Sequence, residues 1–168
     1  SGANYVETID GVLRIAYRLY DSGAPTGDIV EKIYNDGTST WGSAVVAFVQ
    51  RGTSAPEYLE TRDGNLHLAY KSNAGQIAER ILVSGSWGSE TIISTTAGYM
   101  PAYYEEMNGD IRLCFSDSLQ IFEMVKVGDK WGDEEIIATN ANYPAYIQSP
   151  DGSFRLAYMR TTDSYLCE

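Results

Sequence analysis

The chain has 168 residues, with 12 Lys and Arg against 23 Asp and Glu, which gives a formal net charge of −11. The phosphates of nucleic acids and anionic membranes would repel such a chain, and its longest apolar run, Ala44–Val49, is far shorter than the ~20 residues of a membrane-spanning helix. One His and two Cys are too few for a disulfide framework and argue against a structural zinc site.

A short apolar motif with a basic or imidazole group at its second position recurs four times. Its first copy is Leu13-Arg14-Ile15-Ala16-Tyr17, and each copy follows an Asp-Gly or Asn-Gly pair. The later copies begin at Leu66, Ile111 and Phe154, at spacings of 53, 45 and 43 residues. The chain is therefore predicted to contain four repeats, spanning approximately residues 3–55, 56–100, 101–143 and 144–168.

The Asp-Gly and Asn-Gly pairs predict the first two strands of each repeat, because these pairs favour two-residue hairpin turns. Pairing outward from Asp10-Gly11 places Glu7 opposite Arg14 and Tyr5 opposite Ala16. Each repeat is thus expected to set an acid or amide against a basic group and a ring against a small residue. The same rule predicts the pairs Glu60–His67, Glu105–Arg112, Gln148–Arg155, Tyr58–Ala69, Tyr103–Cys114 and Tyr146–Ala157.

Two further strands follow in the first three repeats. The third strand is predicted over Ile29–Ile33, Ile77–Ile81 and Ile121–Val125, and a Trp-Gly pair at Trp41, Trp87 and Trp131 opens the fourth. Four antiparallel strands per roughly 45 residues predict an all-β chain, a β-propeller domain or part of one. It would contain three complete four-stranded blades and a partial fourth.

The last repeat stops partway through its third strand, after Tyr165-Leu166-Cys167-Glu168. A propeller normally closes its ring, and a bare strand edge favours pairing with another chain. We therefore expect either a fragment of a longer propeller or copies that associate as a homo-oligomer to complete a ring, in preference to a self-sufficient monomer.

The repeat pattern resembles that of propellers built from bacterial neuraminidase repeats. This Asp-box family includes sialidases, related glycan-binding lectins and phage tail proteins. Residues Asp36–Trp41 keep the Asp, Thr and Trp spacing of the Asp box, although the Gly stands one place early, and the copies before Trp87 and Trp131 are shorter. The resemblance implies a carbohydrate-related function without a cofactor, outside the cell or on a virion surface.

Residue types that a sialidase needs recur once per repeat at one strand position. Arg14, Arg112 and Arg155 occupy the same position, and Tyr5 and Tyr58 share another. A catalytic centre requires different roles from different blades, so we interpret these residues as structural and predict no catalytic residues. No acidic segment matches the spacing of a Ca²⁺ loop, and no metal site is predicted.

The loops that break the repeat are the predicted ligand surface. They join the second and third strands and connect successive blades, and such loops lie on one face of a propeller. Positive charge and aromatic rings on an otherwise acidic protein suit a glycan or an acidic polysaccharide; the plainer interpretation is ordinary polar loops. The predicted ligand-binding residues are Arg18, Tyr20, Arg51, Lys71, Tyr99, Tyr143 and Arg160.

The sequence thus favours a non-catalytic carbohydrate-binding propeller module, either lectin-like or a receptor-binding part of a phage tail. One alternative is a fragment or subunit of a sialidase-like glycoside hydrolase. Another is a structural scaffold that assembles through open blade edges.

Overall fold

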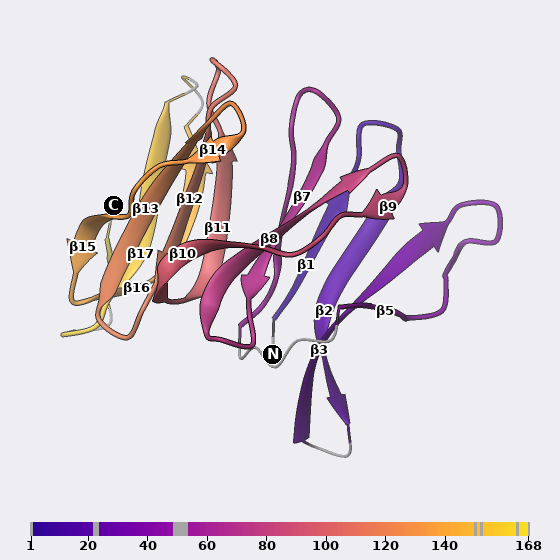
Figure 1. The fold of residues 1–168 in the computed structure, drawn as a ribbon, viewed down its shortest axis with the longest axis horizontal. Coiled ribbons are helices and arrows are strands. Elements are labelled where there is room, and N and C mark those ends of the chain that lie inside the picture. Colours follow the sequence, from indigo (N-terminus) through magenta and orange to yellow (C-terminus); the bar gives the residue numbers. More distant parts are fainter. Residues whose placement is uncertain are drawn as a thin grey trace.

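The computed structural model describes residues 2–21, 24–48, 54–149, 151, 153–163 and 165–167. These residues form four antiparallel sheets arranged as a four-bladed β-propeller, and none of them is helical (Figure 1). No candidate membrane-spanning helix therefore occurs in the described part of the chain. The prediction of an all-β propeller with three complete blades and a partial fourth is confirmed.

Blades 1 to 3 share one plan, in which the last two strands both pair with the third. The strands of blade 1 are β1 (Ala3–Glu7), β2 (Leu13–Asp21), β3 (Ala24–Asn35), β4 (Thr40–Trp41) and β5 (Val45–Phe48). Those of blade 2 are β6 (Glu57–Glu60), β7 (Leu66–Lys71), β8 (Gln76–Val83), β9 (Ser86–Trp87) and β10 (Thr91–Ala97). Those of blade 3 are β11 (Tyr99–Glu105), β12 (Ile111–Ser116), β13 (Gln120–Val127), β14 (Lys130–Trp131) and β15 (Glu135–Thr139). Blade 4 contains β16 (Ala141–Gln148), β17 (Phe154–Arg160) and β18 (Leu166–Cys167).

The hairpin between the first two strands differs from the predicted two-residue turn. The Thr8 N–H donates to the Val12 carbonyl at 3.0 Å, and the Gly11 N–H donates to the Thr8 carbonyl at 2.7 Å. Gly11 has a φ of 80°, whereas Asp10 is not among the residues with positive φ. The loop therefore contains three residues and ends in a left-handed glycine, a turn that Asp-Gly serves equally well.

The longer loop shifts every predicted strand pair by one residue. Glu7 lies opposite Leu13 and Tyr5 opposite Ile15, so the predicted Glu7–Arg14 and Tyr5–Ala16 pairs are wrong. The same shift occurs in the other three blades. Because successive side chains in a strand point to opposite faces, the predicted acids and bases lie on different faces of their sheets.

Gly64→Ala is expected to lower the free energy of unfolding by about 1 kcal/mol, because Gly64 has a φ of 82° that an L side chain rarely adopts. An added Cβ would meet no atom within 4 Å, so conformational strain alone would cause the loss. Chemical denaturation should show a smaller loss for Gly37→Ala, whose φ is not positive. Equal losses in both variants would contradict the left-handed conformation of Gly64.

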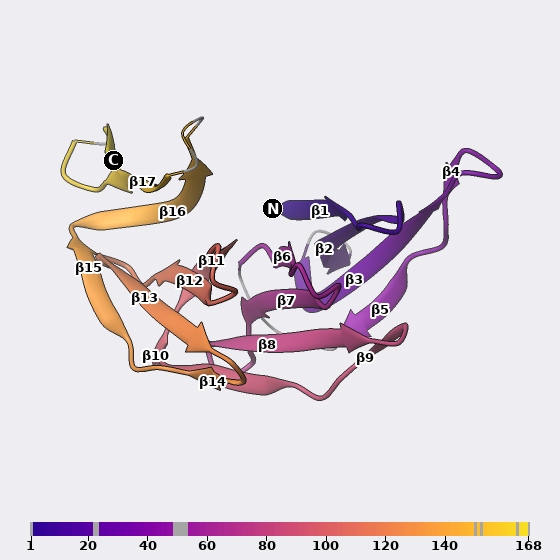
Figure 2. The same cartoon turned by 90° about the horizontal axis from the view of Figure 1, so that it is seen from above.

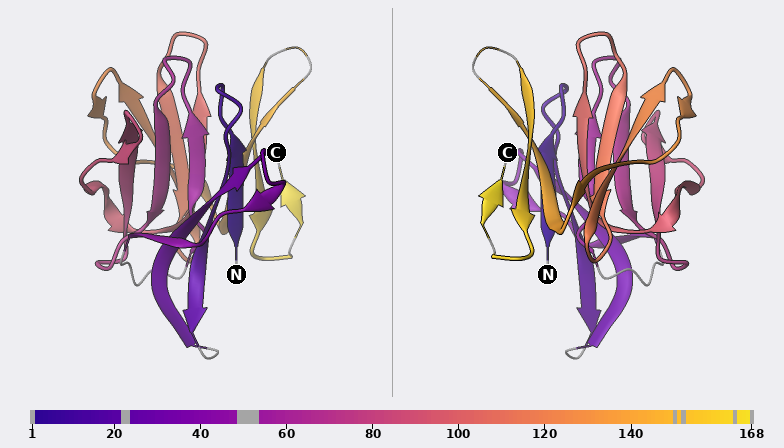
Figure 3. Two further views of the ribbon diagram at one scale, coloured as in Figure 1. Left: turned by 90° about the vertical axis from the view of Figure 1, so that its right-hand side faces the viewer. Right: turned by 90° about the vertical axis from the view of Figure 1, so that its left-hand side faces the viewer.

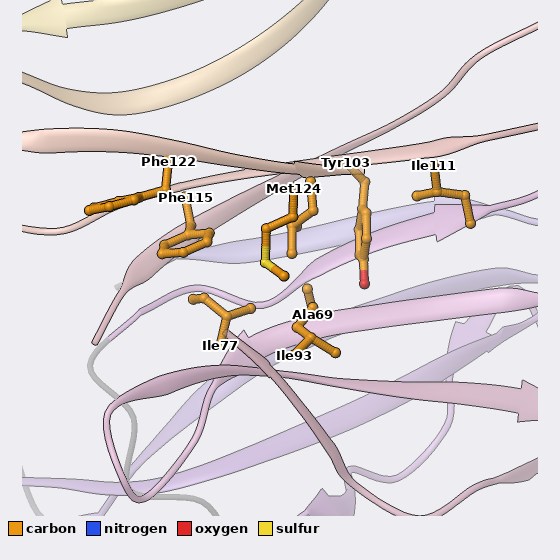
Figure 4. Close-up of a cluster of buried hydrophobic side chains, with 9 residues drawn as sticks. Ala69, Ile77, Ile93, Tyr103, Ile111, Phe115, Phe122 and Met124 are labelled. Atoms are coloured by element: carbon orange, nitrogen blue, oxygen red, sulfur yellow. The ribbon is translucent and has the colours of Figure 1, made fainter. Parts of the chain in front are cut away.

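Each blade packs face to face against the next, and the hydrophobic core is divided among these interfaces. Figure 4 shows the interface of blades 2 and 3, where Ala69, Ile77 and Ile93 of blade 2 face Tyr103 and Phe115 of blade 3. Corresponding clusters join blades 1 and 2 and blades 3 and 4. Cys114 is fully buried in the last of these clusters.

The blades follow one another around an arc (Figure 2). Blade 1, with β1, lies at one end, and blade 4, with β16 and β17, lies at the other. The end-on views of Figure 3 show that the hairpins joining first and second strands all rise on the same side. The turns between third and fourth strands lie on that side too, so this side is called the hairpin face below.

Candidate functional site

The third strand of blades 1 to 3 places one glutamate at the interface with the next blade. These residues, Glu31, Glu79 and Glu123, are called the interface glutamates. Each is bound by a basic or imidazole group from the second strand of its own blade. The pairs are Arg14 Nη1–Glu31 Oε1 at 3.1 Å, His67 Nδ1–Glu79 Oε1 at 2.8 Å and Arg112 Nη1–Glu123 Oε2 at 2.6 Å. The acid partners of these basic groups therefore lie on the third strand of each blade, whereas the sequence analysis predicted them on the first strand.

The following blade supplies further donors to each interface glutamate. A tyrosine of its first strand donates from its hydroxyl: Tyr58 to Glu31 at 2.7 Å, Tyr103 to Glu79 at 2.7 Å and Tyr146 to Glu123 at 2.5 Å. Trp87 and Trp131 donate from Nε1 to Glu31 and Glu79, at 3.3 and 3.2 Å. Burial, and then the negative charge of the neighbouring glutamate, raise the pKa of Tyr58 and Tyr103 above its ordinary value, so both phenols remain donors.

Pockets open beside these clusters on the hairpin face, and the described residues line at least one at each blade interface. The pocket between blades 1 and 2 includes Arg14 and Glu60 and has a volume of about 230 Å³. The pocket between blades 2 and 3 includes His67 and Glu105 and has a volume of about 250 Å³. The pocket between blades 3 and 4, at about 520 Å³, is the largest of the three.

The blade 3–4 pocket combines aromatic rings with groups of both charges. Its rings are those of Tyr104, Tyr146 and Phe154, its cations Arg112 and Arg155, and its carboxylates Glu106 and Glu123. The ring of Tyr104 stacks on Phe154 and lies 5.9 Å from Tyr146, centroid to centroid. Arg112 bridges Glu106 and Glu123, and the hydrogen bond that it donates to Glu106 raises the Arg112 pKa, which keeps the guanidinium charged. The pocket thus offers ring faces, fixed donors and fixed acceptors together.

Sequence reasoning missed this pocket because it treated strand residues that recur as structural and searched only the loops. Two aromatic residues nevertheless break the repeat here. Tyr104 stands where the earlier repeats have Val6 and Leu59, and Phe154 stands where the second repeat has Leu66. A ring in place of an aliphatic side chain at two facing positions was the signal that could have found the pocket.

A second unusual group is the carboxyl of Glu57 on β6, at a position where blades 3 and 4 have Ala102 and Ala145. The Asn4 side-chain amide donates to Glu57 Oε2 at 2.7 Å, and its carbonyl oxygen accepts from the Tyr58 N–H at 3.2 Å. Burial raises the pKa of Glu57 to about 7. No three His, Cys, Asp or Glu side chains group as a metal site in the described residues, Glu57 included.

Three of the predicted ligand residues lie near one another on the face opposite the hairpins. The Lys71 ammonium is 5.8 Å from the centroid of the Tyr99 ring, and the Asn142 amide donates to the Tyr99 hydroxyl at 2.9 Å. Tyr143 follows Asn142 and is 50% exposed. The structure therefore joins the loops of blades 2, 3 and 4 here.

The other predicted ligand residues are dispersed. Arg160 forms an ion pair with Asp163 at 2.5 Å within its own blade. Arg18 and Tyr20 lie on β2 of blade 1, whose hairpin with β3 projects away from the other blades in Figure 1. Arg51 lies outside the described residues. The loop surface remains a prediction.

The chain matches no protein-family model and no curated protein sequence, but solved structures match it. An α-L-arabinanase of Penicillium chrysogenum complexed with arabinobiose aligns with a TM-score of 0.70 and 16% identity, over 94% of this chain and 56% of its own. The intramolecular trans-sialidase from Ruminococcus gnavus aligns with a TM-score of 0.67 and 18% identity, over 93% and 38%. An arginine-to-alanine triple mutant of AofleA from Arthrobotrys oligospora aligns with a TM-score of 0.66 and 14% identity, over 98% and 51%.

The chain is thus a β-propeller of the fold that sialidases and arabinanases share, and it spans 38–56% of the length of the three matched chains. At these identities the likeness shows the fold alone. The matched structures are mostly enzymes, so they do not support the expectation that the chain is non-catalytic. The Asp-box assignment remains a prediction.

Proposed function

We propose that this chain binds carbohydrate without modifying it, and that the pocket between blades 3 and 4 holds the sugar. The observation that carries this proposal is the joint presence of three rings, two arginines and two glutamates in one cavity of about 520 Å³. A cavity of this size accommodates a small ligand, and mixed apolar and polar lining is typical of such sites. The carbohydrate-active neighbours support the proposal at the level of fold.

The charges of the pocket favour a neutral sugar over an acidic one. Sugar hydroxyls both donate and accept hydrogen bonds, so an Arg112–Glu123 pair can bind neighbouring hydroxyls of one ring from both sides. The C–H face of the ring would stack on Tyr104 or Phe154. Arg112 and Arg155 balance the charges of Glu106 and Glu123, so the pocket has no excess positive charge to attract a carboxylated glycan, and the net charge of −11 would repel one.

Tyr104→Ala is expected to weaken binding of a neutral oligosaccharide about 10-fold, because the variant loses the ring on which the sugar stacks. A panel of neutral and sialylated oligosaccharides identifies the best ligand of the unmodified chain, and calorimetric titration then compares the variants. Tyr143→Ala serves as the matched control, because it removes a half-exposed tyrosine of the opposite face. Loss of binding in Tyr143→Ala with retention in Tyr104→Ala would move the site to the loop surface.

Glycoside hydrolysis is the second candidate function, and Glu57 is the observation that favours it. A carboxyl that still holds its proton near pH 7 can act as a general acid toward a glycosidic oxygen. Such a reaction also needs a second carboxylate on the other side of the bond. Turnover of a chromogenic glycoside that Glu57→Gln abolishes, while the variant still binds sugar, would favour hydrolysis over simple binding.

A further inference from the structure

One face of blade 1 is exposed, although the equivalent residues of the other blades are buried. Tyr5 occupies the position of Tyr58 and Tyr103, yet it is 73% exposed, whereas they are 6% and 8% exposed. Trp41, at the position of the two tryptophans that bind interface glutamates, is 40% exposed. Leu13, Ile15 and Tyr17 of β2 lie on the same side as Tyr5, in the places of Leu66, Leu68 and Tyr70 in blade 2. This face is called the tyrosine face.

Blade 4 turns outward the opposite kind of face. Leu166 occupies the position of Ile29, Ile77 and Ile121, which are at most 1% exposed, yet Leu166 is 78% exposed. Ile147, on the same side of this sheet, is 49% exposed, and Ala157 repeats the small residue found at Ala16 and Ala69. Blades 1 to 3 each present a face of this kind to the following blade. In blade 4 this face is called the leucine face.

We propose that the tyrosine face of one copy of this chain binds the leucine face of a second copy. The contact would repeat the interface that already joins blades 1 to 2, 2 to 3 and 3 to 4, since both halves carry the same residue types in the same strand positions. When each copy uses both faces, two copies close into one ring without leaving either face exposed. This proposal is independent of the carbohydrate site.

The alignments cover between 38% and 57% of the solved chains that share this fold, so those chains extend well beyond the length of one copy of this sequence. The exposed Tyr5 and Leu166 would become central, desolvated residues of the contact, and residues in such positions contribute most of the binding energy. The contact is therefore sensitive to single substitutions at these two positions.

Sedimentation equilibrium of the 168-residue chain is expected to show a dimer. Leu166→Glu and Tyr5→Glu should each weaken the dimer at least about 100-fold, because each places a charge in an apolar contact. Leu119→Glu is the matched control, since Leu119 is 54% exposed and lies on neither face, and it should remain dimeric. Circular dichroism confirms that each variant retains its β structure.

A mixture of the two variants tests the head-to-tail arrangement directly. One unaltered tyrosine face and one unaltered leucine face remain in the mixture, so Tyr5→Glu and Leu166→Glu together should form a heterodimer although neither forms a dimer alone. A monomeric unmodified chain would overturn the proposal, because the faces would then close within one chain or stay open. A dimer that survives Leu166→Glu would overturn it too, because like faces would then be pairing.

Discussion

Glu79→Ala is expected to lower the free energy of unfolding by about 3–5 kcal/mol, because it leaves buried charges and donors without their acceptor. Glu79 accepts hydrogen bonds from His67, Tyr103 and Trp131, and Lys126 lies 3.7 Å from it. The side chains of His67 and Lys126 are only 4% and 8% exposed, so water cannot replace the lost carboxylate. Urea denaturation at pH 7 measures the loss.

Glu135→Ala is the control for this experiment, because Glu135 is an exposed glutamate on β15 of the next blade and its removal should change the free energy of unfolding little. At acidic pH, the loss of unfolding free energy caused by Glu79→Ala should be smaller. Burial opposes ionisation, but the hydrogen bonds and charges of His67, Tyr103 and Lys126 together lower the Glu79 pKa below its ordinary value of 4.5. The stabilisation is thus present above pH 4.5 and is lost as the pH falls through the lowered pKa. Similar losses in both variants at pH 7 would contradict the role assigned to the interface glutamates.

Glu57→Gln is expected to stabilise the protein by about 3 kcal/mol at pH 8 and to have little effect at pH 4. The pKa of Glu57 is about 7 in the folded chain and 4.5 as its ordinary value. The folded state therefore binds more protons between these values, and stability falls as the pH rises from 4.5 to 7. Glutamine keeps the shape and can still accept from Asn4, but it carries no charge to bury.

The measurement is the midpoint of thermal unfolding from pH 4 to pH 8 for both proteins. The unmodified chain should lose stability across the upper part of this range, and Glu57→Gln should not lose this component. Glu60→Gln provides a comparison from the same strand, with a carboxylate that accepts from the exposed Ile9 N–H at 2.7 Å. A pH dependence that persists unchanged in Glu57→Gln would show that Glu57 is ionised in the folded chain.

The fold could be predicted from the sequence because several markers recur together. The Trp-Gly pairs, the Asp-Gly turns and the third-strand Ile residues each indicate the same blade. The register could not be predicted with equal success, since Asp-Gly fits both a two-residue turn and a three-residue loop in which only Gly11 needs a positive φ. Because one additional residue in the loop shifts the strand pairing by one position, Arg14 no longer lies opposite Glu7 and pairs with Glu31 of the third strand instead.

The candidate site was harder to predict than the fold. Arg112 and Glu123 are 11 residues apart and lie on adjacent strands, while Tyr146 reaches the same carboxylate from another blade. Their convergence depends on how blades pack face to face, and no spacing within one repeat shows it. Loops such as 140–143 stand out in a sequence because they vary, whereas Tyr104 and Phe154 of the blade 3–4 pocket stand at strand positions that hold aliphatic residues in the earlier repeats.

The interface glutamates also govern how cooperatively the molecule unfolds. Each carboxylate is held by groups from two successive blades, so no blade completes its own polar bonding, and loosening one blade removes donors from its neighbour. The stability of each blade then depends on its contacts with the neighbouring blades, as in other repeat proteins, and does not reside in a single central core.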